Sequence, residues 1–242
     1  MRKMLLVPLL WVVLVASAHA EVDLGSPDKS VDATSAEGDQ VVPAPSKWYA
    51  GFTVGGGRLA GWDMRQVDAC YQSIGYTKSD ESLDFRAMQE LKFYAARRLR
   101  DTVDVEFGYS YATNLGGDNW SRYNSGSNQV TSTRRIKIHV LSASALFRPA
   151  AGKLYFRGGV HASEFATRKT VTGNPANLNT IAAGDQMYGD GVSHGFGTLV
   201  GLGFDFRTGK AGAIRVELNH HFRLGGTRYE KSALNFGYHF NF

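Results

Sequence analysis

Hydrophobic and polar residues alternate with a period of two in several stretches that follow Trp48. The clearest stretches are 102–112, 213–222 and 233–242, where nearly every second residue is aliphatic or aromatic and the residues between are charged, polar or glycine. Successive side chains of a β-strand point to opposite faces, so this alternation predicts strands with one apolar and one polar face. No stretch after Trp48 keeps apolar residues at helical spacing.

Weaker alternating stretches bring the predicted number of strands to eight. Their ranges are 48–59, 85–97, 102–112, 135–148, 154–167, 194–207, 213–222 and 233–242. Polar segments that we expect to be ordinary loops follow the odd-numbered strands, at 60–84, 113–134, 168–193 and 223–232. Tight turns follow the second, fourth and sixth strands. An even strand number with long loops on one side and short turns on the other is typical of an all-β, eight-stranded antiparallel up-and-down transmembrane β-barrel.

The polar face of these strands decides between a membrane barrel and a soluble sheet protein. A water-exposed face usually carries lysine, threonine and serine, whereas this face carries opposite charges and glycines. The interior of an eight-stranded barrel is barely wide enough for its own side chains, and polar groups buried there must satisfy one another. We therefore predict that the apolar face contacts lipid and that an interior polar network contains Glu90, Lys92, Asp104, Glu106, Lys137, His139, Arg157, His161, Arg215 and Glu217.

Two details of this network can be checked. Glu217 is expected to pair with a cation on a neighbouring strand, either Arg157 or a neighbour on the Arg215 side. Phe147 has the opposite parity to Ile136 and Ile138, which would otherwise face lipid together, so a bulge or a shifted register is predicted within 135–148.

The first twenty residues have the layout of a secretory signal peptide: a positive start, an apolar run over 4–15 and a small-residue site ending at Ala20. Removing this segment lowers the formal net charge from +5 to +3, because it contains Arg2 and Lys3 and no acidic residue. We therefore expect no nucleic-acid partner. Residues 21–47, rich in Asp, Ser, Ala and Pro, are expected to form a flexible periplasmic leader, and 48–242 the barrel.

Composition adds two exclusions. Hydrophobic residues make up 43% of the chain, too many for a disordered protein, and the single apolar run is too short for a bundle of membrane-spanning helices. Cys70 is the only cysteine, so no internal disulfide can form. It is expected to be an inert free thiol or half of an intermolecular bridge.

The two ends of the predicted barrel resemble OmpA-like outer-membrane β-barrel proteins. The first strand begins Trp-Tyr-Ala-Gly-Phe at residue 48, and the last two strands contain Ile-Arg-Val-Glu-Leu at 214–218 and end Phe-Gly-Tyr-His-Phe-Asn-Phe at 242. The resemblance implies a bacterial outer-membrane location, contact with lipid including lipopolysaccharide, and a C-terminal signal (Tyr238, Phe240, Phe242) that the barrel-assembly machinery reads. We expect no peptidoglycan-binding domain after the barrel, and the loops contain no motif that identifies a surface ligand.

Candidate chemistry is sparse, and we expect no cofactor, no metal site and no catalytic residue. Lipid A deacylases of similar size use a His-x-Ser-Asn sequence; here His161 and Ser163 match it, but Glu164 stands in place of asparagine. A second loose set is Asp190 with Ser193 and His194. The leading hypothesis is a structural, membrane-integrity or surface-interaction role through the long loops. The alternatives are a narrow porin-like solute or ion pathway and a lipid A-modifying enzyme.

Overall fold

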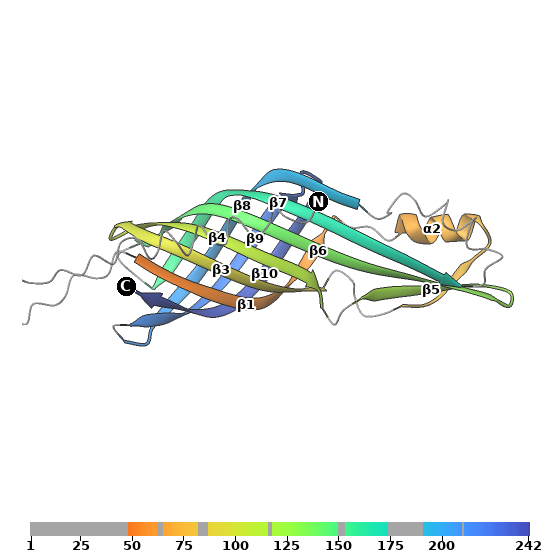
Figure 1. The fold of residues 1–242 in the computed structure, drawn as a ribbon, viewed down its shortest axis with the longest axis horizontal. Coiled ribbons are helices and arrows are strands. Elements are labelled where there is room, and N and C mark those ends of the chain that lie inside the picture. Colours follow the sequence, from red (N-terminus) through yellow and green to blue (C-terminus); the bar gives the residue numbers. More distant parts are fainter. Residues whose placement is uncertain are drawn as a thin grey trace, which may run out of the picture. The chain divides into compact units, whose positions relative to one another are not determined.

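The computed structural model describes residues 48–61, 65–81, 87–115, 118–149, 153–173, 191–209 and 211–242. Their arrangement is shown in Figure 1. The predicted signal peptide and leader lie outside these residues, and both stay predictions. No helix in the described ranges is long and apolar enough to cross a membrane.

Ten strands and one short helix form in the described part of the chain. In order they are β1 (Trp48–Ala60), α2 (Arg65–Ser73), β2 (Thr77–Glu81), β3 (Ala87–Arg100), β4 (Val103–Asn114), β5 (Asn119–Ser125), β6 (Asn128–Phe147), β7 (Leu154–Gly173), β8 (Gly191–Arg207), β9 (Gly212–Leu224) and β10 (Tyr229–Asn241).

Eight of these strands close into a barrel, as the alternation predicts. The hydrogen-bonded order is β6-β4-β3-β1-β10-β9-β8-β7, and an additional pairing of β7 with β6 completes the ring. All pairs are antiparallel, and β1 pairs with β10. The barrel has a turn end, where short connections join β3 to β4, β6 to β7 and β8 to β9, and a loop end, where the longer connections lie.

At the loop end, β6 and β7 continue beyond the barrel, and two additional strands extend the same sheet along β6 (Figure 1). β5 pairs with residues 128–134 of β6, and β2 pairs with β5. We call α2, β2, β5 and the loop-end parts of β6 (128–134) and β7 (169–173) the platform.

The platform corrects two expectations. Residues 60–84 and 113–134 were expected to be ordinary loops without helix or strand, but they contain α2, β2, β5 and the start of β6. β2 has the sequence Thr-Lys-Ser-Asp-Glu, without an apolar residue, so no alternation marks it as a strand. Its backbone is ordered by pairing with β5, a contact that local sequence does not reveal.

The outer wall of the barrel is apolar and the inner wall is polar. On the outer wall, Leu202 of β8, Leu218 of β9 and Leu234 of β10 are direct neighbours in the sheet, and all three are exposed. Aromatic side chains lie outward near the turn end, including Trp48, Phe156 and Phe206. Exposed apolar side chains over so much of a closed sheet indicate contact with hydrocarbon rather than with water.

Replacing Leu218 by arginine should destabilise the folded barrel by about 2–4 kcal/mol, because a lipid-facing charge near the bilayer midplane has this cost. Leu218 is 46% exposed, and its neighbours on both sides are leucines. Urea unfolding in lipid vesicles measures the change. Leu115→Arg is the control, because Leu115 is exposed at the loop end just after β4. Equal effects of the two substitutions would contradict a lipid-facing Leu218.

Candidate functional site: the barrel interior and the platform

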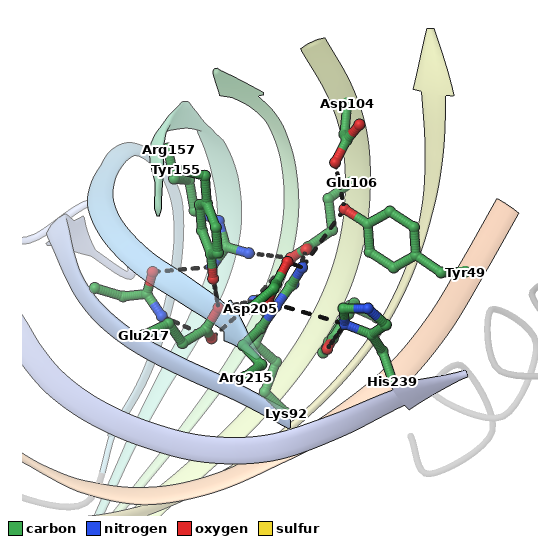
Figure 2. A network of polar contacts seen from close by, with 12 residues as sticks. Tyr49, Lys92, Asp104, Glu106, Tyr155, Arg157, Asp205, Arg215, Glu217 and His239 are labelled. Carbon is green, nitrogen blue, oxygen red and sulfur yellow. Dashed lines mark hydrogen bonds and ion pairs between the residues drawn. The ribbon is translucent and has the colours of Figure 1, made fainter. Parts of the chain in front are cut away.

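The turn-end half of the barrel interior is filled by a layer of paired charges (Figure 2). Arg215 of β9 lies at its centre and is fully buried. Its guanidinium donates to Glu106 Oε2 at 2.6 Å, and to Asp205 Oδ1 and Oδ2 at 2.8 and 3.1 Å. The same group lies over the rings of three tyrosines, which are Tyr94 at 4.4 Å, Tyr155 at 4.9 Å and Tyr49 at 5.4 Å from the ring centroids.

A second part of the layer links strands on opposite sides of the lumen. Lys92 of β3 donates to Glu106 of β4 at 2.8 Å and to Glu217 of β9 at 3.0 Å. Arg157 of β7 also pairs with both carboxylates, at 3.0 Å in the case of Glu217. The expected pairing of Glu217 with Arg157 is therefore present, but it crosses over β8 rather than joining adjacent strands.

Nearer the turn end, Arg148 bridges two carboxylates, donating to Asp104 at 2.8 Å and to Asp205 at 2.6 Å. Tyr49 also donates to Asp104, at 2.9 Å. Within this layer four buried cations therefore face four buried carboxylates: Lys92, Arg148, Arg157 and Arg215 against Asp104, Glu106, Asp205 and Glu217. Buried charges persist only when they are paired in this way, because desolvation of an unpaired charge costs several kcal/mol.

Glycines of β8 provide the space that these large side chains need. A Cβ atom added at Gly203 would lie 2.4 Å from the Tyr155 hydroxyl. One added at Gly197 would lie 2.6 Å from His161 Nε2. The glycine-rich sequence of β8 therefore reflects close packing inside a narrow barrel.

Between the charged layer and the loop end lies a smaller polar group. Lys231 of β10 is fully buried and pairs with Glu90 of β3 at 2.5 Å. Asn235 donates to the other oxygen of Glu90 at 3.4 Å. This pair ties β3 to β10 across β1.

Above these polar groups, one apolar core lies at the barrel mouth and continues into the platform. Its barrel members come from six strands and its platform members from α2, β5 and the segments beside them. The buried residues are Leu59, Tyr71, Tyr76, Met88, Ala112, Tyr123, Val130, Ile136, Ile138, Val140, Phe165 and Leu224. The platform is therefore packed onto the barrel by a continuous hydrophobic core.

Tyr123 of β5 anchors α2 in this core. Its ring stacks on Tyr71 with centroids 3.9 Å apart and planes 12° from parallel. Its hydroxyl donates to Asp68 at 2.7 Å, and Lys78 lies 3.5 Å from the same carboxylate. Burial, reinforced by the Asp68 carboxylate, raises the pKa of Tyr123 well above its usual value, so the phenol stays a donor. Cys70, on the same helix, is half-buried and forms no disulfide.

The structure places eight of the ten predicted network residues in the barrel interior. These are Glu90, Lys92, Asp104, Glu106, Arg157, His161, Arg215 and Glu217. The expectation was wrong for Lys137, which is exposed, and for His139, which is half-buried on the outer wall. Both belong to β6, whose register runs without a bulge. Ile136 and Ile138 point inward to the apolar core while Phe147 points to lipid, so the assumed parity of this strand was inverted.

Several interior residues were missing from the predicted network. Asp205 lies in the alternating pattern of β8 and could have been found from it. Arg148 lies inside the predicted strand 135–148, but it has the parity that was assigned to the lipid face, so the inverted register concealed it. Lys231 precedes the predicted start of the last strand, so a strand boundary concealed it. The buried tyrosines Tyr49, Tyr94 and Tyr155 had the correct parity, but their polarity is ambiguous in a hydrophobicity pattern.

The candidate catalytic residues make contacts of a structural kind. His161 Nε2 lies 2.9 Å from the Phe222 carbonyl oxygen, and Ser163 Oγ accepts a hydrogen bond from the Gly225 amide at 2.8 Å. Glu164, on the opposite face of β7, lies 3.7 Å from His194. Asp190 lies outside the described residues. Within the described residues, no group of three or more His, Cys, Asp or Glu side chains could hold a metal ion.

The predicted C-terminal assembly signal lies at the turn end. Phe240 and Phe242 are exposed to the lipid side, and the Tyr238 hydroxyl lies 3.1 Å from Thr208 Oγ1. Recognition of these residues by the assembly machinery stays a prediction.

Comparison with known proteins gives no family model that matches the chain and no curated protein that matches it. Among solved structures, Ail, the attachment invasion locus protein of Yersinia pestis, in complex with the heparin analogue sucrose octasulfate, is similar. The match covers 81% of this chain and 99% of that one, with 9% identity and a TM-score of 0.45. Neisserial surface protein A matches with 10% identity and a TM-score of 0.39, and the match covers 81% of this chain and 98% of that one. The outer membrane protein OprG from Pseudomonas aeruginosa matches with 9% identity and a TM-score of 0.39, and the match covers 82% of this chain and 96% of that one.

The architecture itself identifies the class of protein. A closed barrel of eight antiparallel strands, with a predominantly apolar outer wall and a charged interior, leaves no barrel strand edge unpaired within the membrane. The chain is thus a bacterial outer-membrane protein with the eight-stranded barrel fold.

Proposed function

We infer that this protein is a non-conducting outer-membrane barrel whose role is to hold a folded platform on the cell surface. The observation that carries this proposal is the single apolar core that lies at the barrel mouth and continues into the platform. In outer-membrane barrels the short turns are periplasmic and the longer loops extracellular. The platform would therefore face outward, and the N-terminal leader would lie in the periplasm.

Two layers support a closed lumen. The charged layer is cross-linked by ion pairs from β3, β4, β7, β8 and β9, all of them buried. The apolar core above it would have to admit water for an ion to pass, and apolar side chains disfavour that. A pore would need both layers to open.

The platform supports a surface-interaction role more than a catalytic one. Its α2 and β5 are held by the stacked Tyr71 and Tyr123, and β2 and β5 add a paired sheet. A pre-folded surface loses little conformational entropy on binding a partner. The two side chains that suggested lipid A chemistry, His161 and Ser163, are instead engaged with backbone groups.

Planar bilayer recordings test the closed lumen. The full chain should give no discrete conductance steps, because charges and apolar residues block the lumen in series. Ile138→Asp combined with Met88→Asp would hydrate only the apolar core, so this variant should also give no steps, because the charged layer still blocks the lumen. Regular conductance from the unmodified chain that changes on neutralising Glu106 would replace this proposal with the pore alternative.

Deletion of the platform tests the surface role. Residues 62–86 and 117–133 would each be replaced by a short Gly-Ser turn, leaving the barrel residues unchanged. Cells that express the full chain should adhere to mucin- or matrix-coated surfaces, and cells with the shortened chain should not. Heat-dependent gel mobility checks that both barrels fold. Equal adhesion by both, or a lipid A mass that changes on expression and reverts in His161→Ala, would contradict the proposal.

A further inference from the structure

The outer face of β6 and β7 is continuous from the lipid belt onto the platform (Figure 1). The two strands pair from Phe147 with Phe156 to Val130 with Gly173 without a register shift. Odd-numbered residues of β6 and even-numbered residues of β7 therefore share this outer face along its whole length. We call it the β6–β7 wall.

The wall begins, toward the turn end, with hydrocarbon-facing side chains. Leu141 of β6 and Val160 of β7 are exposed. The next outward residue of β6 is His139, which lies beside Tyr111 of β4 with ring centroids 5.0 Å apart and near the Tyr109 hydroxyl at 2.7 Å. Rings with a polar edge are enriched at the level where hydrocarbon meets the headgroups. This aromatic group therefore marks the membrane interface on the wall.

Immediately beyond the aromatic group lies a concentration of positive charge. Arg135 of β6 is directly opposite Arg168 of β7, and Lys137 is the next outward residue on β6. All three are exposed. Like charges directly opposite in a sheet repel each other. Asp118 pairs with Arg135, whereas Lys137 and Arg168 form no ion pair with any described residue.

Beyond the basic residues, the wall becomes rich in hydroxyl groups. Thr133 is opposite Thr170, and Thr131 is opposite Thr172. Trp120 of β5 is paired with Thr133 and so lies on the same face, with the Arg122 guanidinium 5.0 Å from its ring centroid. Hydroxyls beside an indole ring and a guanidinium suit a saccharide, which offers both apolar ring faces and hydroxyl groups.

The order of these side chains matches one class of molecule. From His139 at the interface to Thr133 the wall runs six residues, about 20 Å along the strand and about 15 Å along the membrane normal at a tilt of about 40°. The headgroup layer of an ordinary phospholipid adds only about 5–8 Å per leaflet to the hydrocarbon core, so a phospholipid would not reach the threonines. A glycolipid with acyl chains, then phosphates, then an extended saccharide would contact the three zones in sequence.

We propose that the β6–β7 wall binds the phosphorylated glycolipid of the outer leaflet, lipopolysaccharide, with its phosphates on Arg135, Lys137 and Arg168 and its inner saccharide along Thr131, Thr133, Thr170 and Trp120. The proposal uses the outward orientation of the platform given under the proposed function. It does not depend on a closed lumen or on adhesion. Binding brings anionic phosphates between the opposed guanidinium groups and removes their repulsion.

The test uses the full chain, refolded in a zwitterionic detergent, with purified lipopolysaccharide as the probe. The variant R135Q/K137Q/R168Q should bind at least tenfold more weakly than the unmodified chain. The matched control R97Q/R100Q/R207Q removes three exposed positive charges at the turn end and should change binding less than twofold. Heat-dependent mobility and far-UV circular dichroism confirm folding of each variant.

Two further measurements distinguish binding of the phosphates from binding of the saccharide. Removing the phosphates from lipopolysaccharide should weaken its binding to the unmodified chain at least tenfold. The affinity should then equal that of intact lipopolysaccharide for the variant R135Q/K137Q/R168Q. Trp120→Ala should weaken binding of lipopolysaccharide with a full core but not of lipid A alone. Equal loss in the turn-end control, or equal competition by phosphatidylglycerol vesicles, would overturn the proposal in favour of unspecific charge attraction. Conductance measurements on the same samples report separately on the proposed function.

Discussion

Replacing Arg215 by methionine is expected to destabilise the barrel by about 3–5 kcal/mol, the cost of removing one partner from a buried ion pair. Arg215 is fully buried and contacts Glu106 and Asp205, and methionine can fill much of its volume without supplying a charge or a donor. The two carboxylates keep other partners, but each loses its contact with the central guanidinium. Urea unfolding of the chain in lipid vesicles measures the change.

The control for this experiment is Arg207→Gln, at the exposed end of β8, which should change the free energy of unfolding by less than about 0.5 kcal/mol. Adding Asp205→Asn to Arg215→Met should recover part of the loss, because it removes a carboxylate left without enough positive charge. A fully stable Arg215→Met barrel, or a double variant less stable than the sum of its single changes, would show that the charged layer does not hold the strands together.

Replacing Tyr123 by alanine should release the platform while leaving the barrel folded. The change removes the stack on Tyr71 and the hydrogen bond to Asp68, and truncating a buried aromatic residue typically costs about 3–5 kcal/mol. We expect rapid hydrogen exchange and protease cleavage in α2, β2 and β5, because their local stability falls most.

Tyr123→Phe separates the two contributions. It keeps the stack and loses only the hydrogen bond to Asp68, so platform protection should fall by about 1.5–3 kcal/mol. Heat-dependent gel mobility should stay unchanged in both variants, since β5 is not part of the ring of eight strands. If Tyr123→Ala lowered the unfolding midpoint of the barrel as strongly as it exposed the platform, the two would form one cooperative unit and the prediction would fail.

The sequence predicts the eight barrel strands because each carries its own two-residue alternation. The local sequence of each strand therefore determines which side chains face lipid and which face the lumen. In β9, for example, Arg215 and Glu217 alternate with aliphatic residues. The alternation fails where the environment changes along a strand. β6 passes from the lipid-embedded barrel into the platform, and there Ile136 and Ile138 face the apolar core inside while Lys137 faces outward.

The platform could not be predicted in the same way. α2 has nine residues, and its order depends on Tyr71 meeting Tyr123, which is 52 residues away in the chain. The pairings within the charged layer were also beyond sequence reasoning. Lys92 reaches Glu217 across the lumen, and the tilt of barrel strands decides which residues meet there.

The contact between β1 and β10 has a consequence for biogenesis. Apart from the platform strands β2 and β5, each of the other seven barrel contacts joins a barrel strand to the next barrel strand along the chain. The β1–β10 contact instead joins the first strand to the last, from Tyr49 with Asn241 to Ala60 with Glu230. The cylinder can be sealed only after the final segment has been delivered. In a chain that lacks β10, β1 and β9 would each have an unpaired strand edge. The backbone amides and carbonyls at these edges could not form hydrogen bonds with hydrocarbon. Such a nascent form must be shielded until its last strand arrives, or it will add strands from its neighbours.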